Sequence, residues 1–194
     1  VIFRAYDDAC AYRFVSLSDK PFIVKDEQAD FRFPEDRTAY IPYIHKKWKG
    51  SLEEILENDF QCPYTHSLLS EWNERYSIAP LLVECPEGKK VVITEADLMN
   101  YPGMFLYNYK KGNGETLSGY FARVPDKTGI GGHNMVQEKI DSRKDYIAEC
   151  QPFEKFPWRV VAVSSSDKEL TDSDIVWKLA TPAADTDWTW VRPG

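Results

Sequence analysis

Long apolar runs are missing from this sequence of 194 residues, and no stretch approaches the roughly 20 residues needed to cross a bilayer. Basic residues are also scarce relative to acidic ones, 24 against 31, which gives a net charge of −7. This balance disfavours nucleic acid and anionic membranes as partners, because both attract a basic face. We therefore expect no nucleic-acid partner and no membrane partner.

The short motifs of several enzyme classes are missing as well. The sequence has no Gly-x-Ser-x-Gly and no Cys-x-x-Cys, and its three histidines, His45, His66 and His133, are scattered. Nucleophilic hydrolysis by this chain alone and a zinc site are therefore unsupported. The glycine-rich residues 129–132 resemble a phosphate cradle only superficially, because residues 125–128 before them are interpreted as loop and no helix signal follows.

Cysteine is sparse, and the four residues present are widely and irregularly spaced. They are Cys10, Cys62, Cys85 and Cys150. Three disulfide pairings are possible if all four are oxidised, with a single disulfide as another alternative. The spacing favours free, mostly buried thiols.

What the sequence does contain is a succession of short strand signals separated by turns. Phe31 and Phe33 alternate with charged residues, and Asn113-Gly114 between apolar runs predicts a hairpin. From residue 71 onward we expect strands at residues 72–77, 81–84, 91–94, 104–109, 117–124, 158–163 and 172–179. One short helix is expected at residues 51–58, where Ser51 and Glu54 have capping-box spacing. The pattern predicts an all-β sandwich or barrel forming one domain.

The stretch of residues 91–104 is the best local candidate for a site. Three β-branched residues lead into Glu95 and Asp97, which would share one face of an extended chain, and a Pro-Gly turn follows. A solvated carboxylate at a strand end is the simpler interpretation of Glu95. Calcium needs about six to eight oxygen ligands, which these two side chains cannot supply alone.

Both ends of the sequence suggest a piece of a larger protein. Val1 to Phe3 has the composition of a strand already under way, and Trp188 and Trp190 form an aromatic segment close to the end. We expect these tryptophans to pack on a domain outside this chain, so that the lack of a signal peptide is uninformative about the compartment.

A set of segments, taken together and in order, resembles glycoside hydrolase family 97. The matching segments are residues 6–14, residues 31–34 with 39–40, residues 93–98 with 101–104, residues 157–161, and residues 185–188 with 192–194. They span almost the whole chain. Residues 44–70 carry no matching segment, and Ala9 stands where the family usually has glycine.

The resemblance implies a galactose-mutarotase-like β-supersandwich over residues 1–194, followed in the parent protein by a catalytic (β/α)8 barrel. It implies a calcium-dependent α-glucosidase or α-galactosidase, periplasmic or secreted, whose catalytic residues lie in the barrel. The fragment alone would have no activity and would bind no calcium tightly. In the family this domain lends one glutamate to the calcium, and the matching position is Glu95. Its partners would be the barrel of the same chain and an oligosaccharide substrate.

Two other functions remain open from the residues. The chain could be a free-standing carbohydrate-binding β-sandwich without a metal role. It could also be a mutarotase-type enzyme acting alone, which would require a histidine and a carboxylate together on the concave face.

Overall fold

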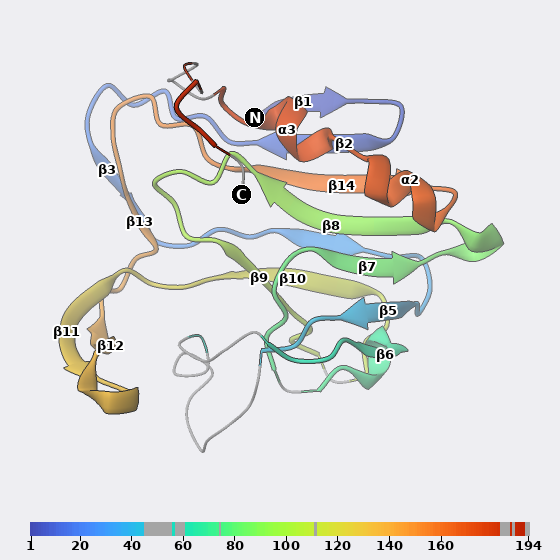
Figure 1. Ribbon diagram of the computed structural model, residues 1–194, viewed down its shortest axis with the longest axis horizontal. Coiled ribbons are helices and arrows are strands. Elements are labelled where there is room, and N and C mark those ends of the chain that lie inside the picture. The colour runs from blue at the N-terminus through green and yellow to red at the C-terminus, as the bar shows by residue number, and fades with distance from the viewer. Residues whose placement is uncertain are drawn as a thin grey trace.

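The computed structural model of the protein describes residues 1–44, 56, 61–73, 75–110, 112–182, 187 and 189–192. Its largest element is a seven-stranded antiparallel sheet, which runs across the upper and middle part of Figure 1. In spatial order its strands are β1 (Ile2–Ala5), β2 (Ala9–Arg13), β14 (Trp158–Ser164), β8 (Lys90–Ala96), β7 (Leu81–Glu84), β5 (Thr38–Ile41) and β6 (Thr65–Leu68).

Smaller antiparallel sheets complete the β structure. One has three strands, β4 (Asp30–Arg32), β10 (Thr116–Phe121) and β9 (Met104–Tyr107), and two have two strands, β13 (Ala148–Cys150) with β3 (Phe22–Val24) and β11 (Pro125–Gly131) with β12 (Gln137–Arg143). Short 3-10 turns lie at η1 (Leu69–Glu71), η2 (Pro86–Gly88) and η3 (His133–Met135).

The main core lies between the large sheet and the three-stranded sheet. Ile41, Val83 and Ile93 from the large sheet pack with Leu106 and Leu117 from the smaller one, and all five are fully buried. These positions alternate with outward-facing residues along each strand, which is the pattern expected of a sandwich. The predicted all-β sandwich is confirmed.

The outer face of the large sheet is partly covered by α2 (Asp167–Asp172) and α3 (Ile175–Leu179), which lie over β14 and β8 in Figure 1. The strand expected at residues 172–179 is therefore wrong. Ile175 and Leu179 stand four residues apart, so they share one face of a helical turn and are buried, whereas Trp177 is 82% exposed. The strand was predicted because Ile175, Trp177 and Leu179 are apolar at every second position, but Trp177 faces solvent and does not belong to the buried side.

The interpretation of residues 125–128 as loop is also wrong. Residues Pro125–Gly131 form β11, which pairs with β12 as a ribbon that extends away from the sandwich in Figure 1. Most of β11 is exposed, so it lacks the apolar alternation by which a half-buried strand is recognised. Gly131 fits because a Cβ there would lie 2.4 Å from Cδ of Lys139 on β12.

Residues 72–77, another expected strand, follow an irregular path where they are described. Trp72 donates its indole N–H to the carbonyl of Arg75, and the Arg75 amide donates to the carbonyl of Asn73. These local bonds turn the chain, and Ser77 alone joins neighbouring strands through isolated bridges to Tyr43 and Leu106. The strand prediction was wrong here because buried aromatic residues in a turn resemble a strand.

Other sequence predictions had mixed outcomes. β9 and β10 pair as the antiparallel hairpin expected around Asn113-Gly114. The helix expected at residues 51–58 lies outside the described residues, apart from Leu56, which is buried. Cys10, Cys85 and Cys150 are free thiols as expected, but of the four cysteines only Cys150 is buried, so the expectation of mostly buried thiols is wrong; burial raises the pKa of Cys150 to about 11. None of the described helices is long and apolar enough to span a bilayer.

Candidate functional site

Glu95 lies near the end of β8, on the face of the large sheet that looks into the sandwich. The strand alternates, so that Ile93 and Glu95 point inward while Val92 and Thr94 point outward. On the neighbouring strand β14, Arg159 stands directly opposite Glu95 in the ladder. The two side chains therefore meet between the layers.

Glu95, Arg159 and Glu27 form a buried group that we call the carboxylate–arginine cluster. The Arg159 Nη1 atom lies 2.7 Å from Oε2 of Glu95, while its Nε and Nη2 atoms lie 2.7 and 2.8 Å from the two oxygens of Glu27. The side chains are 1% exposed for Arg159, 4% for Glu27 and 14% for Glu95. Glu27 thus holds the guanidinium in a bidentate pair through Nε and Nη2, and Glu95 accepts from the third nitrogen, Nη1.

The turn after β8 fixes the second oxygen of Glu95. The backbone amide of Met104 donates to Oε1 of Glu95 at 3.0 Å. A Cβ placed on Gly103 would lie 3.3 Å from the same oxygen, so glycine leaves room for the carboxylate at this turn. The Pro-Gly turn anticipated from the sequence therefore helps to orient Glu95.

The cluster carries an excess of negative charge, with two carboxylates against one guanidinium. Burial raises the pKa of the Glu95 carboxyl, and the nearby Glu27 carboxylate raises it further, against the opposing effects of the Met104 amide and Arg159. For Arg159, burial works to lower the pKa but Glu27 and Glu95 outweigh it, so the guanidinium stays charged. Burial and Glu27 therefore both disfavour the charged form of Glu95, and a further cation beside it would favour the carboxylate.

Aromatic rings enclose the guanidinium. Its Cζ lies 4.7 Å from the ring centre of Phe121 and 5.9 Å from that of Tyr101, both on the inner side of the sheet. The pKa of Tyr101 is raised by burial and by the nearby Glu27 carboxylate. These rings exclude water from Arg159 and strengthen its charge interactions.

Asp97 does not join this cluster, contrary to the shared face expected with Glu95. β8 ends at Ala96, and Asp97 has a φ of +59°, so its side chain turns elsewhere. Its side chain is 6% exposed, lies 3.0 Å from Nη2 of Arg13 and accepts a hydrogen bond from the Thr181 amide. Burial raises the pKa of Asp97, but these hydrogen bonds outweigh it and the net shift is downward.

The cluster can supply one ligand to a cation but cannot hold one alone. Within the described ranges, no group of three or more His, Cys, Asp or Glu side chains is placed to bind a metal ion. Each Glu95 oxygen already accepts one hydrogen bond and retains a second lone pair. Glu95 therefore fits the part of a single carboxylate in a calcium shell whose other oxygens come from elsewhere.

Sequence reasoning did not identify Arg159 or Glu27. Arg159 had a signal, because it is a charged residue inside the otherwise apolar run of β14, and a buried arginine needs a partner. Glu27 had none, since it lies in a charged segment typical of an exposed turn.

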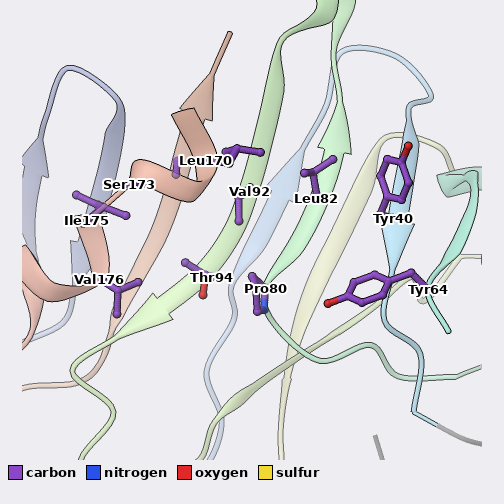
Figure 2. Close-up of a pocket in the computed structure, with 11 residues that line it drawn as sticks. Tyr40, Tyr64, Pro80, Leu82, Val92, Thr94, Leu170, Ser173, Ile175 and Val176 are labelled. Carbon is purple, nitrogen blue, oxygen red and sulfur yellow. The ribbon is translucent and has the colours of Figure 1, made fainter. Parts of the chain in front are cut away.

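On the opposite face of the large sheet, a groove of about 470 Å³ runs between the helices and strand β5 (Figure 2). Leu82 on β7 and Val92 and Thr94 on β8 form its floor. The α2–α3 segment forms one wall, and Tyr40 and Tyr64 stand at the other side. The groove is mainly apolar.

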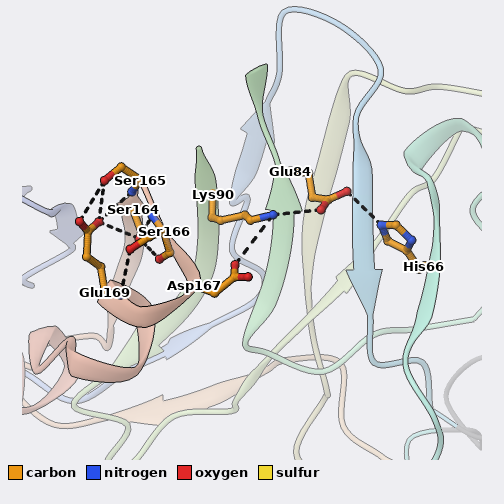
Figure 3. A network of polar contacts seen from close by, with 8 residues as sticks. All are labelled: His66, Glu84, Lys90, Ser164, Ser165, Ser166, Asp167 and Glu169. Carbon is orange, nitrogen blue, oxygen red and sulfur yellow. Dashed lines mark hydrogen bonds and ion pairs between the residues drawn. The ribbon is translucent and has the colours of Figure 1, made fainter. Parts of the chain in front are cut away.

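A chain of charged contacts crosses the same face (Figure 3). Glu84 is bonded by His66 Nε2 at 3.0 Å and by Lys90 Nζ at 3.0 Å, and Lys90 also lies 3.9 Å from Asp167. This supplies a histidine–carboxylate pair of the kind that a mutarotase-type enzyme would need. However, hydrogen bonds from His66 and Lys90 lower the pKa of Glu84, which makes it a weak proton acceptor.

Comparison with known proteins gives the same assignment as the sequence motifs. The family profile described as Glycosyl-hydrolase 97 N-terminal matches residues 1–182. The retaining alpha-galactosidase of Bacteroides thetaiotaomicron is 40% identical over the whole chain, which spans 29% of that relative's length.

Solved structures show the same fold. A glycoside hydrolase family 97 enzyme from Pseudoalteromonas sp., in complex with acarbose, matches 99% of this chain with a TM-score of 0.68 and 19% identity, over 25% of its own length. A β-arabinopyranosidase matches 95% of this chain with a TM-score of 0.67 and 19% identity, over 28% of its own length. With the family profile covering nearly every strand of the sandwich, the chain belongs to glycosyl-hydrolase family 97, as its N-terminal domain.

Proposed function

We propose that this domain serves a larger α-glycosidase by supplying Glu95 to a calcium ion shared with the catalytic (β/α)8 barrel of the same chain. In this role the domain also braces the barrel and forms one wall of the active-site cleft. The chain alone is not a catalyst. The observation that carries the proposal is the unbalanced negative charge of the carboxylate–arginine cluster at the end of β8.

The surroundings of Glu95 support a contact with another domain. Leu98 and Met99, which follow β8 directly, are 44% and 69% exposed. Exposed apolar residues beside a buried charged group are typical of a surface that is covered in the assembled protein. The chain spans 29% of its Bacteroides relative, which leaves ample sequence for the second domain.

Calcium, when bound, would orient substrate hydroxyls and stabilise developing negative charge. Glu95 would hold one side of the ion, and Arg159 would keep the Glu95 carboxylate from rotating through its bond at Oε2. Glu27 would neutralise Arg159, so that Glu95 retains its charge for the metal. A site divided in this way forms fully only when both domains are present.

For the parent protein we propose the hydrolysis of α-galactosides, with α-glucosides as the second candidate substrate class. We place this activity in the periplasm or outside the cell. The 40% identity to a retaining alpha-galactosidase supports this order. The alternative of a free-standing carbohydrate-binding module gives the charged cluster no role beyond stability. Assays of the full-length enzyme on aryl α-galactosides and α-glucosides, with cell fractionation, test these assignments.

The metal role is tested by Glu95→Gln in the full-length enzyme. Glutamine keeps the size of the side chain and one acceptor oxygen, so it retains one of the two bonds from Met104 and Arg159, but it removes the anion that would bind calcium. We expect the calcium concentration for half-maximal activity to rise on the order of 10–100-fold.

The matched control is Glu87→Gln, the same change at a side chain that is 78% exposed and paired with Lys89. It should leave the calcium dependence unchanged. If Glu95→Gln folds and keeps the wild-type calcium dependence, the assignment of Glu95 is wrong.

A further inference from the structure

We propose that the groove on the outer face of the large sheet is a binding site for a short neutral saccharide. Its volume of about 470 Å³ lies within the roughly 300–1,000 Å³ typical of small-molecule sites. The groove opens on the face opposite to Glu95, and the inference therefore does not depend on the metal role of that residue.

The hydroxyl groups of the groove identify the chemistry of the ligand. Tyr40, Tyr64, Thr94 and Ser173 line it, and none of their side-chain oxygens makes a hydrogen bond within the described part of the chain. The Ser173 oxygen is buried and unpaired. A purely apolar occupant would cover the hydroxyl groups of Tyr40, Tyr64 and Thr94 without giving them partners, at a cost of about 1–3 kcal/mol for each one that it buries. An occupant that carries its own hydroxyl groups removes that cost.

Apolar surface makes up the rest of the site. Figure 2 shows Tyr64 reaching toward Pro80 from the β6 side, across from Leu82 and Val92 on the floor. A pyranose ring has a face of C–H groups and carries hydroxyl groups around its edge. The C–H face suits contact with the Tyr64 ring and with the aliphatic side chains of the groove. The hydroxyl groups and the apolar surface of the groove are complementary to that arrangement.

The charged groups near the groove disfavour an anionic ligand. Lys90 is engaged by Glu84 and Asp167, and His66 is bonded to Glu84, so these charges are paired with one another (Figure 3). The two carboxylates outnumber the one lysine, which disfavours anions such as phosphates.

Tyr40 and Tyr64 are available to a ligand. They are 38% and 59% exposed, and His66 stacks on Tyr40 with ring centres 4.2 Å apart. This stacking fixes the Tyr40 ring before a ligand arrives, which lowers the entropy cost of binding.

The test titrates the 194-residue chain, which carries the groove, with raffinose and with maltotriose. Saturation-transfer NMR and calorimetry should show saturable binding with a dissociation constant on the order of 1 mM or tighter. Tyr64→Ala should weaken binding about tenfold, and Thr94→Val, which keeps the shape and removes the hydroxyl, about fivefold. Tyr109→Ala, at an exposed tyrosine outside the groove, is the matched control and should bind as the wild type does.

Several outcomes overturn the inference. One is the absence of saturation transfer from the folded chain to either trisaccharide, and another is wild-type affinity in Tyr64→Ala. If the chain dimerises in sedimentation experiments and Tyr64→Ala makes it monomeric, the groove is an interface between copies instead. If Tyr64 of the full-length enzyme resists iodination, another domain covers the groove. Wild-type calcium dependence in Glu95→Gln would overturn the metal role of Glu95 but would leave all of these results unchanged.

Discussion

Replacing Arg159 by methionine tests the reasoning about the carboxylate–arginine cluster most directly. Methionine has a similar length and fills the space, but it leaves Glu27 and Glu95 facing one another without a cation. Removal of one partner from a buried ion pair costs about 3–5 kcal/mol, because the remaining charge is desolvated and unpaired. For a chain of this size that corresponds to a fall in melting temperature of about 6–20 °C.

The pH dependence distinguishes this mechanism from a simple packing defect. Arg159 acts to lower the pKa of the buried Glu95 carboxyl, which is already raised, so without Arg159 this pKa should lie further above its unfolded value. A carboxyl with a raised pKa contributes stability that is fully present below its unfolded pKa and is lost as the pH rises through its folded pKa. The variant should therefore approach wild-type stability on acidification and fall away from it toward neutral pH.

Urea unfolding followed by tryptophan fluorescence, between about pH 4 and 8, measures both effects. Arg32→Met makes the same change at an exposed position on β4 and should stay within about 0.5 kcal/mol of the wild type. The double variant Arg159→Met/Glu27→Gln removes one of the two facing carboxylates and should recover part of the loss. A destabilisation by Arg159→Met below about 1 kcal/mol, or one independent of pH, would refute the reasoning.

Three further predictions follow from the described contacts. The 194-residue chain should show no turnover of aryl α-galactosides or α-glucosides, and measurable release of the aryl group would contradict a site shared with the barrel. Asp97→Asn should lower the free energy of unfolding by about 3 kcal/mol at neutral pH, because Arg13 loses its buried charged partner. The pKa of Asp97 is lowered in the folded state, so the difference between variant and wild type should vanish as the pH falls through that pKa. Urea unfolding at several pH values measures this. Leu179→Ala should lower the free energy of unfolding by about 2–5 kcal/mol because Leu179 is buried, whereas Trp177→Ala should lower it by less than about 1 kcal/mol because Trp177 is exposed. Equal losses of stability in thermal melts would contradict the helical face assigned to α3.

The sequence predicted the sandwich because most of its strands are half-buried. Residues 81–84 and 158–163 alternate or run apolar in the way that burial requires, and both became strands of the large sheet. The ribbon β11–β12 was missed for the opposite reason, because its exposed side chains carry no such pattern. These two strands form by backbone pairing with each other, and backbone pairing requires no particular pattern of apolar and polar residues.

The candidate site shows a similar division. Glu95 was located by a local motif, and the turn that supplies the Met104 amide was visible nearby in the sequence. Glu27 and Arg159 lie 132 positions apart, so their contact depends on how the sheets pack. The alternation rule placed Asp97 beside Glu95, but that rule holds only while the strand continues, and β8 ends one residue earlier.

The pairing of β8 with β14 also bears on how the chain folds without error. In the native ladder Arg159 stands opposite Glu95, and both side chains point into the sandwich. A slip of one residue would turn every side chain of one strand to the other face, placing a charge on the wrong side and an unpaired partner in the core. Apolar strands such as β8 and β14 are otherwise tolerant of such slips. We therefore expect the buried ion pair to act as a register check, which penalises misaligned pairing of these two strands.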